Sequence, residues 1–462
     1  MTPTLVAIAG YLSIQFAIGI WVSRRIKTED DYLVAGRKLG YPLVIFSIFA
    51  TWFGAETIVG AAGRSAVEGL SLASAEPFGY GLCLVAMGLI FAVPLWRRRL
   101  TTLADLFRQR YSSTVERVAA VILIPSSILW AAAQVRAFGH VLSSSSTLEV
   151  EAAIAFAAFV TIAYTIFGGL LVDAITDVIQ GVMLVIGLVV IAVAAVSHLG
   201  GPLAAIDAVR TANHALLASA PHMGLWAGLE AWAIPVCGSV VATELVARVI
   251  AARSPAVARR SAVTAGILYV AVGVIPVFLG LTGAGVAVEV ADPEQMIPAI
   301  AERLLPTALY AVFAGGLISA ILSTVDSTLL VASGLLSHNV VVPLLRTPDE
   351  RTKVRVARAG VLGFGIVAYV LAVRAEGVFA LVEQASAFGS AGSLIVVTFG
   401  LFTRWGGART ALATLLAGMA IYLLGLATAS PYPFLLSLGA ALGTYVLGSA
   451  MGSVRLRMTD NV

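Results

Sequence analysis

The chain has 462 residues, of which 59% are hydrophobic and only 12% are charged. Soluble domains carry about 25% charged residues, and no water-soluble core could hide this much apolar surface, so lipid must be the solvent. The net charge of +4 would otherwise suggest a nucleic-acid partner. The placement of the basic residues, which gather between apolar segments, argues against that partner.

Apolar segments long enough to cross a bilayer follow one another along the whole chain. A spanning helix needs about 20 mainly apolar residues, and we predict an all-α polytopic membrane protein with about thirteen such helices. The connections 199–225 and 287–305 are the longest loops on the outer side. The predicted spans are 4–23, 41–63, 74–96, 116–140, 151–168, 173–198, 226–248, 261–286, 306–342, 353–373, 378–402, 409–427 and 431–451.

The basic residues divide unequally between the two sets of loops. Most of the 29 Lys and Arg residues lie on one side, at the ends of the odd-numbered spans other than the fifth. Cytoplasmic loops carry such an excess. We therefore expect a multi-pass protein of the plasma (inner) membrane, with its N terminus outside and its C terminus in the cytoplasm.

Two spans that lie five helices apart carry an interruption at mid-depth. The second span contains Gly54 within a polar stretch, and the seventh contains Pro235 and Gly238. Transporters built from inverted repeats bind their substrate where such helices are broken. The pair therefore predicts a LeuT-type five-plus-five inverted repeat, with one helix before it and two after. The single transporter domain 1–462 would divide into 1–40, 41–198, 226–402 and 403–462.

Four stretches resemble sequence signatures of one transporter family. Residues 31–40 read DYLVAGRKLG, 164–180 contain YTIFGGL and TDVIQ, 244–252 read ELVARVIAA, and 320–327 read AILSTVDS. Together they are similar to the motifs of the sodium/solute symporters. The resemblance implies a secondary active transporter, not an enzyme, that imports a small organic solute with sodium by alternating access. It also implies gating or structural roles for Arg37, Glu244 and Arg248.

A sodium site is predicted around one turn of the ninth span. In a helix the carbonyl of Ala320 lies near the hydroxyls of Ser323 and Thr324, although such hydroxyls also bond back to their own helix. A broken helix frees further carbonyl oxygens for a cation. The family resemblance assigns those of Ala50 and Phe53 to the same ion.

A second cation or proton site is predicted around Asp177. An ionised carboxylate at mid-bilayer costs on the order of 2.5–3.5 kcal/mol, so Asp177 needs a partner. It can pair structurally with Arg37, or it can form a second site with Asp326 and Ser327. Two neighbouring carboxylates cannot both remain charged and unpaired, so one would bind a cation or a proton.

Trp52 and Trp130 resemble two aromatic positions of the high-affinity choline transporters within the family. Aromatic faces recognise quaternary ammonium ions, and Glu56, beside Gly54, can neutralise a cation. A third tryptophan of those transporters is replaced here by Ala242. We expect Trp52, Gly54, Glu56 and Trp130 to line a substrate site, with an organic cation or amine as the leading class. Amino acids and small carboxylates are the alternative.

The predicted partners follow from this interpretation. Sodium is expected as the coupling ion, without an organic cofactor, and the other partners are the solute and the lipid membrane, with no nucleic acid. The sequence leaves the oligomeric state open. An ion channel and a transporter-derived sensor are the alternatives from other classes, but no motif typical of a selectivity filter occurs in the sequence.

Overall fold

The computed structural model describes residues 3–72, 74–144, 148–219, 224–286, 290, 293–375 and 377–459. Within these ranges the chain is helical, with no strand beyond one isolated bridge. The α-helices are α1 (Pro3–Ser23), α2 (Glu29–Val34), α3 (Tyr41–Trp52), α4 (Ala61–Glu68), α5 (Phe78–Ala86), α6 (Ala92–Arg97), α7 (Ala104–Arg110), α8 (Ser113–Ser144), α9 (Val150–Phe167), α10 (Leu170–His198), α11 (Pro202–Ser219), α12 (Leu225–Ala233), α13 (Thr243–Ala251), α14 (Pro255–Thr282), α15 (Met296–Leu304), α16 (Thr307–Gly334), α17 (Glu350–Arg374), α18 (Val378–Ala387), α19 (Ser390–Phe402), α20 (Ala408–Ala427) and α21 (Pro433–Thr459).

Shorter helical pieces interrupt or connect these helices. Four are wider π-helical turns, which occur mostly as local bulges and frequently at functional sites. They are η2 (Glu56–Gly60), η3 (Met87–Phe91), η4 (Ile234–Gly238) and η7 (Leu335–Val341). The 3₁₀ turns are η1 (Ala35–Arg37), η5 (Ala284–Val286), η6 (Pro293–Gln295) and η8 (Val342–Leu344).

The described residues contain 11 helices that are long and apolar enough to cross a membrane, or up to 12 when the bent pair α3–α4 counts as one span. The first predicted span corresponds to α1, which is not counted among these helices. The polytopic, all-helical class is therefore confirmed, whereas the count of thirteen stays a prediction.

Both interruptions predicted from the sequence are present. Helices α3 and α4 meet at a bend of 56°, and α12 gives way to η4 and then to non-helical residues before α13 begins at Thr243. Each broken span is the first of five within the predicted segments 41–198 and 226–402. A further break separates α18 from α19, in the last span of the second segment.

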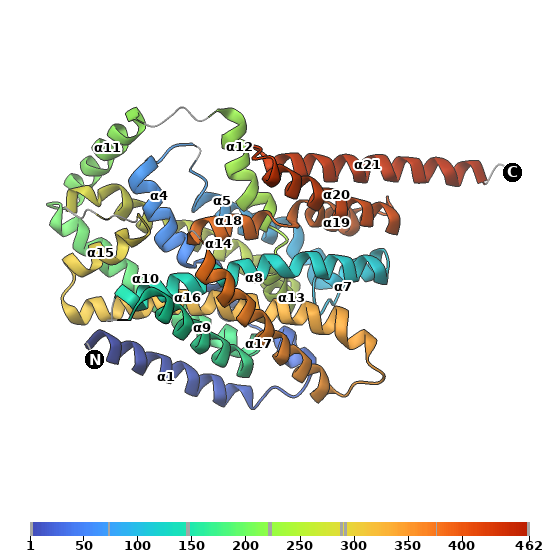
Figure 1. The fold of residues 1–462 in the computed structure, drawn as a ribbon, viewed down its shortest axis with the longest axis horizontal. Helices are drawn as coiled ribbons and strands as arrows, with labels where there is room; N and C mark the ends of the chain where they lie inside the picture. The colour runs from blue at the N-terminus through green and yellow to red at the C-terminus, as the bar shows by residue number, and fades with distance from the viewer. Residues whose placement is uncertain are drawn as a thin grey trace.

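Helix α16 lies at the centre of the bundle. It packs against α10, α8, α17 and α1, and nearly every side chain from Phe313 to Gly334 is buried. Figure 1 shows α8, α10 and α16 running along the long axis, with α11 and α15 at one end and α7 at the other. Helices α20 and α21 pack against each other at the edge of the bundle.

The two half-helices α3 and α13 are joined by backbone hydrogen bonds at one end. The amide of Leu39 donates to the carbonyl of Ala251 at 3.2 Å, and the amide of Arg253 donates to the carbonyl of Leu39 at 2.9 Å. The indole nitrogen of Trp96 donates to the carbonyl of Ala252 at 2.7 Å. The start of α3 and the end of α13 are thus held together beside α6.

Candidate functional site

The break between α3 and η2 frees polar backbone groups in the middle of the bundle. In a continuous helix the amide of Ala55 would bond to the carbonyl of Thr51; here it donates to Oε1 of Gln134 at 2.9 Å. The hydroxyl of Thr324 reaches the freed carbonyl of Thr51 at 2.9 Å and also lies 3.2 Å from the carbonyl of Ala320. The break therefore faces α16 directly.

The other predicted sodium ligands divide between two neighbourhoods. Among the described residues that follow α3, no backbone amide donates a hydrogen bond to the carbonyl of Ala50 or of Phe53. They lie on the broken segment that Thr324 contacts. Ser323, by contrast, donates its hydroxyl hydrogen to Oδ1 of Asp177. Thr324 and Ala320 thus lie at the break, and Ser323 connects it to the carboxylate on α10.

Asp177 is fully buried and accepts hydrogen bonds from two serines. Ser47 of α3 donates to its Oδ2 at 2.6 Å, and Ser323 of α16 donates to Oδ1. Its nearest cation is Arg248, whose Nη2 lies 4.0 Å from Oδ2. Arg37, the structural partner that the sequence suggested, instead donates to the backbone carbonyl of Arg99 at 3.3 Å.

Arg248 forms a buried ion pair with Asp173. Its Nη2 lies 2.6 Å from Oδ2 of Asp173, and the exposed fractions of the two side chains are 0% and 3%. Ser327 accepts a hydrogen bond from the same Nη2 and donates to Asp173 Oδ2 at 3.1 Å. The structure therefore joins Ser327 to Asp173 and Arg248.

Asp326 faces a different helix. Thr165 of α9 donates to its Oδ1 at 2.7 Å, whereas its Oδ2 is buried without a hydrogen-bond partner among the described residues. Of the three residues predicted as one site, Asp177 and Ser327 therefore share Arg248 as a neighbour, whereas Asp326 contacts α9. An unpartnered buried oxygen suits a protonated carboxyl group, because the neutral form avoids most of the desolvation cost.

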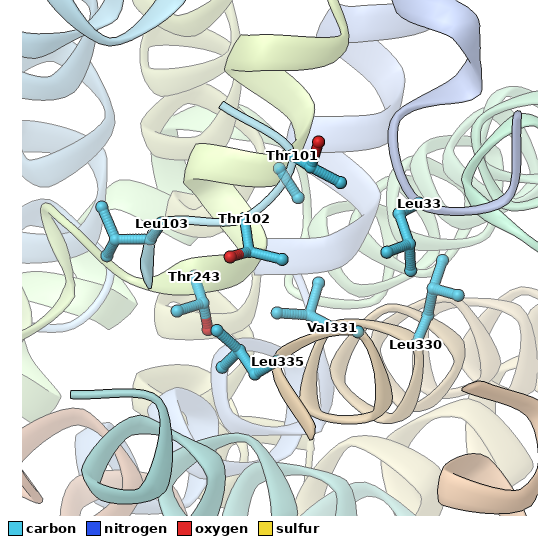
Figure 2. A pocket seen from close by; sticks show the side chains of 10 residues that line it. Leu33, Thr101, Thr102, Leu103, Thr243, Leu330, Val331 and Leu335 are labelled. Carbon is cyan, nitrogen blue, oxygen red and sulfur yellow. The ribbon is translucent and has the colours of Figure 1, made fainter. Parts of the chain in front are cut away.

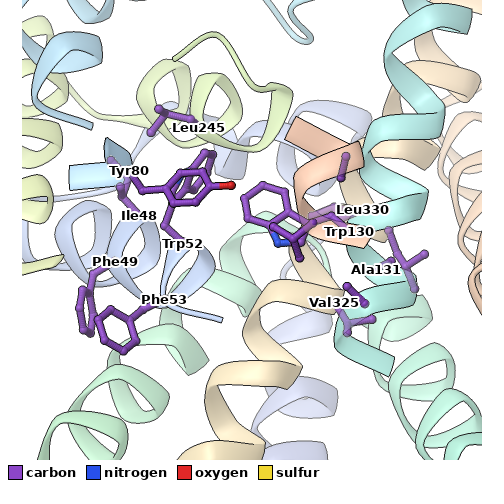
Figure 3. Packing of buried hydrophobic residues seen from close by; sticks show 14 of the residues in the cluster. Ile48, Phe49, Trp52, Phe53, Tyr80, Trp130, Ala131, Leu245, Val325 and Leu330 are labelled. Atoms are coloured by element: carbon purple, nitrogen blue, oxygen red, sulfur yellow. The ribbon is translucent and has the colours of Figure 1, made fainter. Parts of the chain in front are cut away.

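The aromatic residues predicted for the substrate lie together. The rings of Trp52 and Trp130 are 5.1 Å apart between centroids and nearly perpendicular. Figure 3 shows them with Tyr80, whose hydroxyl faces Trp130. The indole nitrogen of Trp52 is buried and has no hydrogen-bond partner, so it is free to donate to a bound molecule.

Glu56 is 1% exposed and lies against this aromatic pair. Its Oε1 accepts from the indole nitrogen of Trp130 at 3.2 Å, and its Oε2 accepts from Nε2 of Gln134 at 2.8 Å. Gly54 makes this approach possible, because a Cβ there would lie 2.5 Å from Oε2 of Glu56 and 2.9 Å from Oε1 of Gln134. The four residues predicted for the substrate site thus meet at the break, with Gln134 as a fifth.

A small cavity of roughly 20 Å³ adjoins Trp130 at the break between η4 and α13. Ala242 lines it, together with the hydroxyl-bearing residues Ser126, Ser239, Thr243, Ser386, Ser390 and Ser393. Ser386 shares a hydrogen bond of 2.8 Å with the hydroxyl of Tyr80. The cavity therefore has a polar wall beside the indole of Trp130.

A second cavity, also of roughly 20 Å³, reaches Thr243. Figure 2 shows Thr101, Thr102 and Leu103 on one side of it and Val331 and Leu335 on the other. Thr243, at the start of α13, therefore lines both cavities.

Polar contacts connect α7 to η7 next to Thr101 and Thr102, which line this second cavity. Asp105 of α7 accepts from Asn339 at 3.1 Å and lies 3.3 Å from Nε2 of His338. Burial raises the pKa of Asp105, but the contacts with His338 and with the amides of Thr101 and Thr102 outweigh it and hold this pKa below its usual value. Asp105 is therefore a stable anion that ties α7 to η7.

Glu244, the remaining predicted gating residue, lies at the start of α13. Its carboxylate accepts hydrogen bonds from Ser127 of α8 and, at 3.2 Å, from Thr243. Its backbone carbonyl accepts from Nη1 of Arg248 at 3.1 Å. Glu244 thereby connects α8 to the half-helix that carries Arg248.

Comparison with protein families identifies the chain. The model described as "Sodium:solute symporter family" matches residues 32–418. The chain belongs to this family. It is accordingly a sodium-coupled solute transporter and not an enzyme.

Curated relatives of this symporter include transporters of different solutes. The high affinity choline transporter 1 of Homo sapiens is 27% identical over 82% of this chain and 69% of its own length. The Caenorhabditis elegans protein of that name is 25% identical over 82% and 70%. A sodium/proline symporter of Staphylococcus aureus is 26% identical over 80% and 75%.

Solved structures of transporters share the fold. A Na⁺-coupled sialic acid symporter in a substrate-bound outward-open state superposes with a TM-score of 0.85, at 17% identity and 98% coverage of both chains. A nucleobase-cation-symport-1 family transporter in a closed conformation gives 0.60, at 16% identity, with 90% of this chain and 93% of the other covered. The LeuT-type architecture predicted from the sequence is thereby confirmed.

Sequence reasoning missed several residues of the site. Asp173 lies four positions before Asp177, so both carboxylates share one face of α10, and this spacing could have revealed it. Gln134 bears the same relation to Trp130 on α8. Ser47, the donor to Asp177, carries no signal of this kind and becomes visible only in three dimensions.

Proposed function

We propose that this symporter imports a small organic solute carrying a cationic amine or ammonium group, together with sodium. The observation that supports this is the carboxylate of Glu56 beside two indoles. Its hydrogen-bond donors, Trp130 and Gln134, are neutral, and within the described residues no Lys, Arg or His forms an ion pair with it. A cation in this position would gain from both the ring faces and the anion.

An amino acid is the second candidate substrate. Helix α19 begins at Ser390, on the wall of the cavity beside Trp130. The amino end of a half-helix carries a partial positive charge that favours an anionic group of a substrate. A zwitterion would place its ammonium group near Glu56 and its carboxylate at this helix end.

The coupling ion in this proposal binds at the break in α3. The carbonyls of Ala50, Phe53 and Ala320 and the hydroxyls of Ser323 and Thr324 are its ligands, all of them oxygens, which hard cations prefer. The contact of Thr324 with the carbonyls of Thr51 and Ala320 supports this arrangement.

The proposal also includes the orientation in the plasma (inner) membrane, with the N terminus outside. In the fold α1 begins at the end that carries α11 and α15, and α21 ends towards α7 (Figure 1). The basic segment around Arg97, Arg98 and Arg99 lies between α6 and α7, which supports a cytoplasmic position for that end.

Uptake by reconstituted protein tests the function. Purified protein in proteoliposomes would be given radiolabelled choline or proline with an inward sodium gradient, with potassium as the control. Uptake of choline that requires the sodium gradient is expected. Proline uptake without choline uptake would favour the second candidate, and sodium-independent uptake of both would contradict the proposal.

Replacing Glu56 by glutamine separates the two substrate classes. Glutamine keeps the size and one acceptor but removes the charge, so we expect the affinity for a cationic solute to fall at least several-fold. A purely anionic solute should bind equally well or better. Competition against radiolabelled substrate measures both. Glu68→Gln, at an exposed side chain paired only with Arg64, is the matched control.

Removing both hydroxyls, in Ser323→Ala/Thr324→Ala, should raise the sodium concentration for half-maximal transport at least several-fold, because two of five proposed ligands are lost. Ser333→Ala is the control, since Ser333 is buried on the same helix but donates to the carbonyl of Leu330. Sodium activation identical to wild type in the folded double variant would exclude this site.

A further inference from the structure

Asp173, Asp177 and Arg248 are buried together where α3, α10, α13 and α16 meet. Resting on the proposed function, we infer that the guanidinium of Arg248 takes the place of a second sodium ion at Asp173 and Asp177. The transporter then binds one sodium ion per cycle, at the break in α3. The positive charge that a second ion would bring is instead supplied by the chain itself.

The oxygens that a second ion would need are already bonded to Arg248 and its partners. Nη2 of Arg248 lies 2.6 Å from Oδ2 of Asp173, and the hydroxyl of Ser327 bonds to both groups. Oγ of Ser327 also lies 2.7 Å from the backbone carbonyl oxygen of Ser323. An ion could bind here only by displacing the guanidinium.

Arg248 is held in this position from several helices. Its Nε donates to the carbonyl of Ser47 on α3 at 3.3 Å, and its Nη1 donates to the carbonyl of Glu244 on α13 at 3.1 Å. Arginine remains protonated in proteins, and this side chain is 0% exposed. A permanent positive charge is therefore fixed among the carboxylates.

The carboxylate of Asp177 is within reach of the same charge. Nη2 of Arg248 lies 4.0 Å from its Oδ2, and both oxygens of Asp177 already accept from Ser47 and Ser323. Like charges repel, and the repulsion is stronger in a protein interior than in water. The charge on Arg248 would therefore oppose the binding of a sodium ion to Asp177.

Asp326 does not restore the missing ligands. Its Oδ1 accepts from Thr165 of α9, and the structure records no hydrogen bond between Asp326 and Asp177, Ser327 or Arg248 in the described part of the chain. It remains a candidate for binding a proton. The aspartates that surround Arg248 are therefore Asp173 and Asp177.

Sodium binding to purified protein tests the inference without a substrate. Binding of radioactive sodium at equilibrium and sodium-dependent thermal stabilisation would be measured for wild type, Arg248→Gln and the triple variant Arg248→Gln/Asp173→Asn/Asp177→Asn. We expect one ion per wild-type protein. Arg248→Gln leaves Asp173 and Asp177 without their cation, so it should bind a second ion and become strongly sodium-dependent in stability. The triple variant, which also lacks both carboxylates, should return to one ion.

Arg136→Gln is the matched control, because Arg136 is half-buried and, among the described residues, donates to a backbone carbonyl, that of Ala372 at 3.0 Å. It should bind sodium as wild type does.

Two ions on wild type, or one ion on folded Arg248→Gln, would overturn the inference. If Arg248→Gln does not fold, two ions on the triple variant would overturn it equally, because the second ion would then need neither carboxylate. No sodium binding by wild type at all would contradict the proposed function, and the inference with it, whereas two ions would contradict the inference alone.

Discussion

Replacing Trp52 by leucine should weaken substrate binding by more than tenfold. A desolvated cation over an aromatic face gains about 2 kcal/mol or more, and each 1.4 kcal/mol corresponds to about tenfold in affinity. Leucine fills much of the space but has no ring face. The measurement is the dissociation constant of the solute that passes the uptake test, determined by competition with purified protein at saturating sodium.

Trp52→Phe is the comparison that isolates the ring. Both substitutions remove the indole nitrogen, which has no hydrogen-bond partner among the described residues, but phenylalanine keeps an aromatic face opposite Trp130. We therefore expect Trp52→Phe to lose much less affinity than Trp52→Leu. Equal losses in two well-folded variants would mean that the ring face contributes nothing, and the cationic substrate would have to be abandoned.

Asp173→Asn should destabilise the protein more than neutralising any exposed carboxylate. Breaking a buried ion pair by removing one partner typically costs about 3–5 kcal/mol, because the remaining charge stays buried without compensation. Asp177, 4.0 Å from Arg248, offsets part of this, so we expect a loss of free energy of unfolding near the lower end of that range. Unfolding of the purified protein by a denaturing detergent measures it.

Two further variants show whether the pair itself is responsible. Asp207→Asn, at an exposed position on α11, should change stability by no more than about 0.5 kcal/mol, as surface substitutions usually do. Arg248→Gln/Asp173→Asn removes both charges and should recover much of the loss. A double variant as unstable as Asp173→Asn would point to lost packing instead of an unpaired charge.

The architecture was largely predictable because lipid imposes a simple rule on sequence. Every crossing needs a long apolar segment, and the breaks at Gly54 and Gly238 stood out within such segments. Helices α11 and α15 were not expected, since they fall in the loops 199–225 and 287–305. A criterion based on 20 apolar residues ignores shorter, more polar helices of this kind.

The site was only partly predictable, and the reason is distance along the chain. The oxygens of Ala320, Ser323 and Thr324 share one helical turn, so local geometry predicts their proximity. The pairing of Arg248 with Asp173 joins residues 75 positions apart. No helical periodicity relates two residues on different helices. The sequence therefore could not show that Arg248, and not Arg37, pairs with the aspartates.

The backbone bonds at Leu39 constrain how this protein can move. Leu39 precedes α3, and its amide and carbonyl bond to the residues at the end of α13, so the two half-helices share a fixed attachment at that end. A displacement of α3 alone would have to break both bonds, whereas a joint rotation breaks neither. We therefore expect α3 and α13 to move together at this end, although one belongs to each half of the chain.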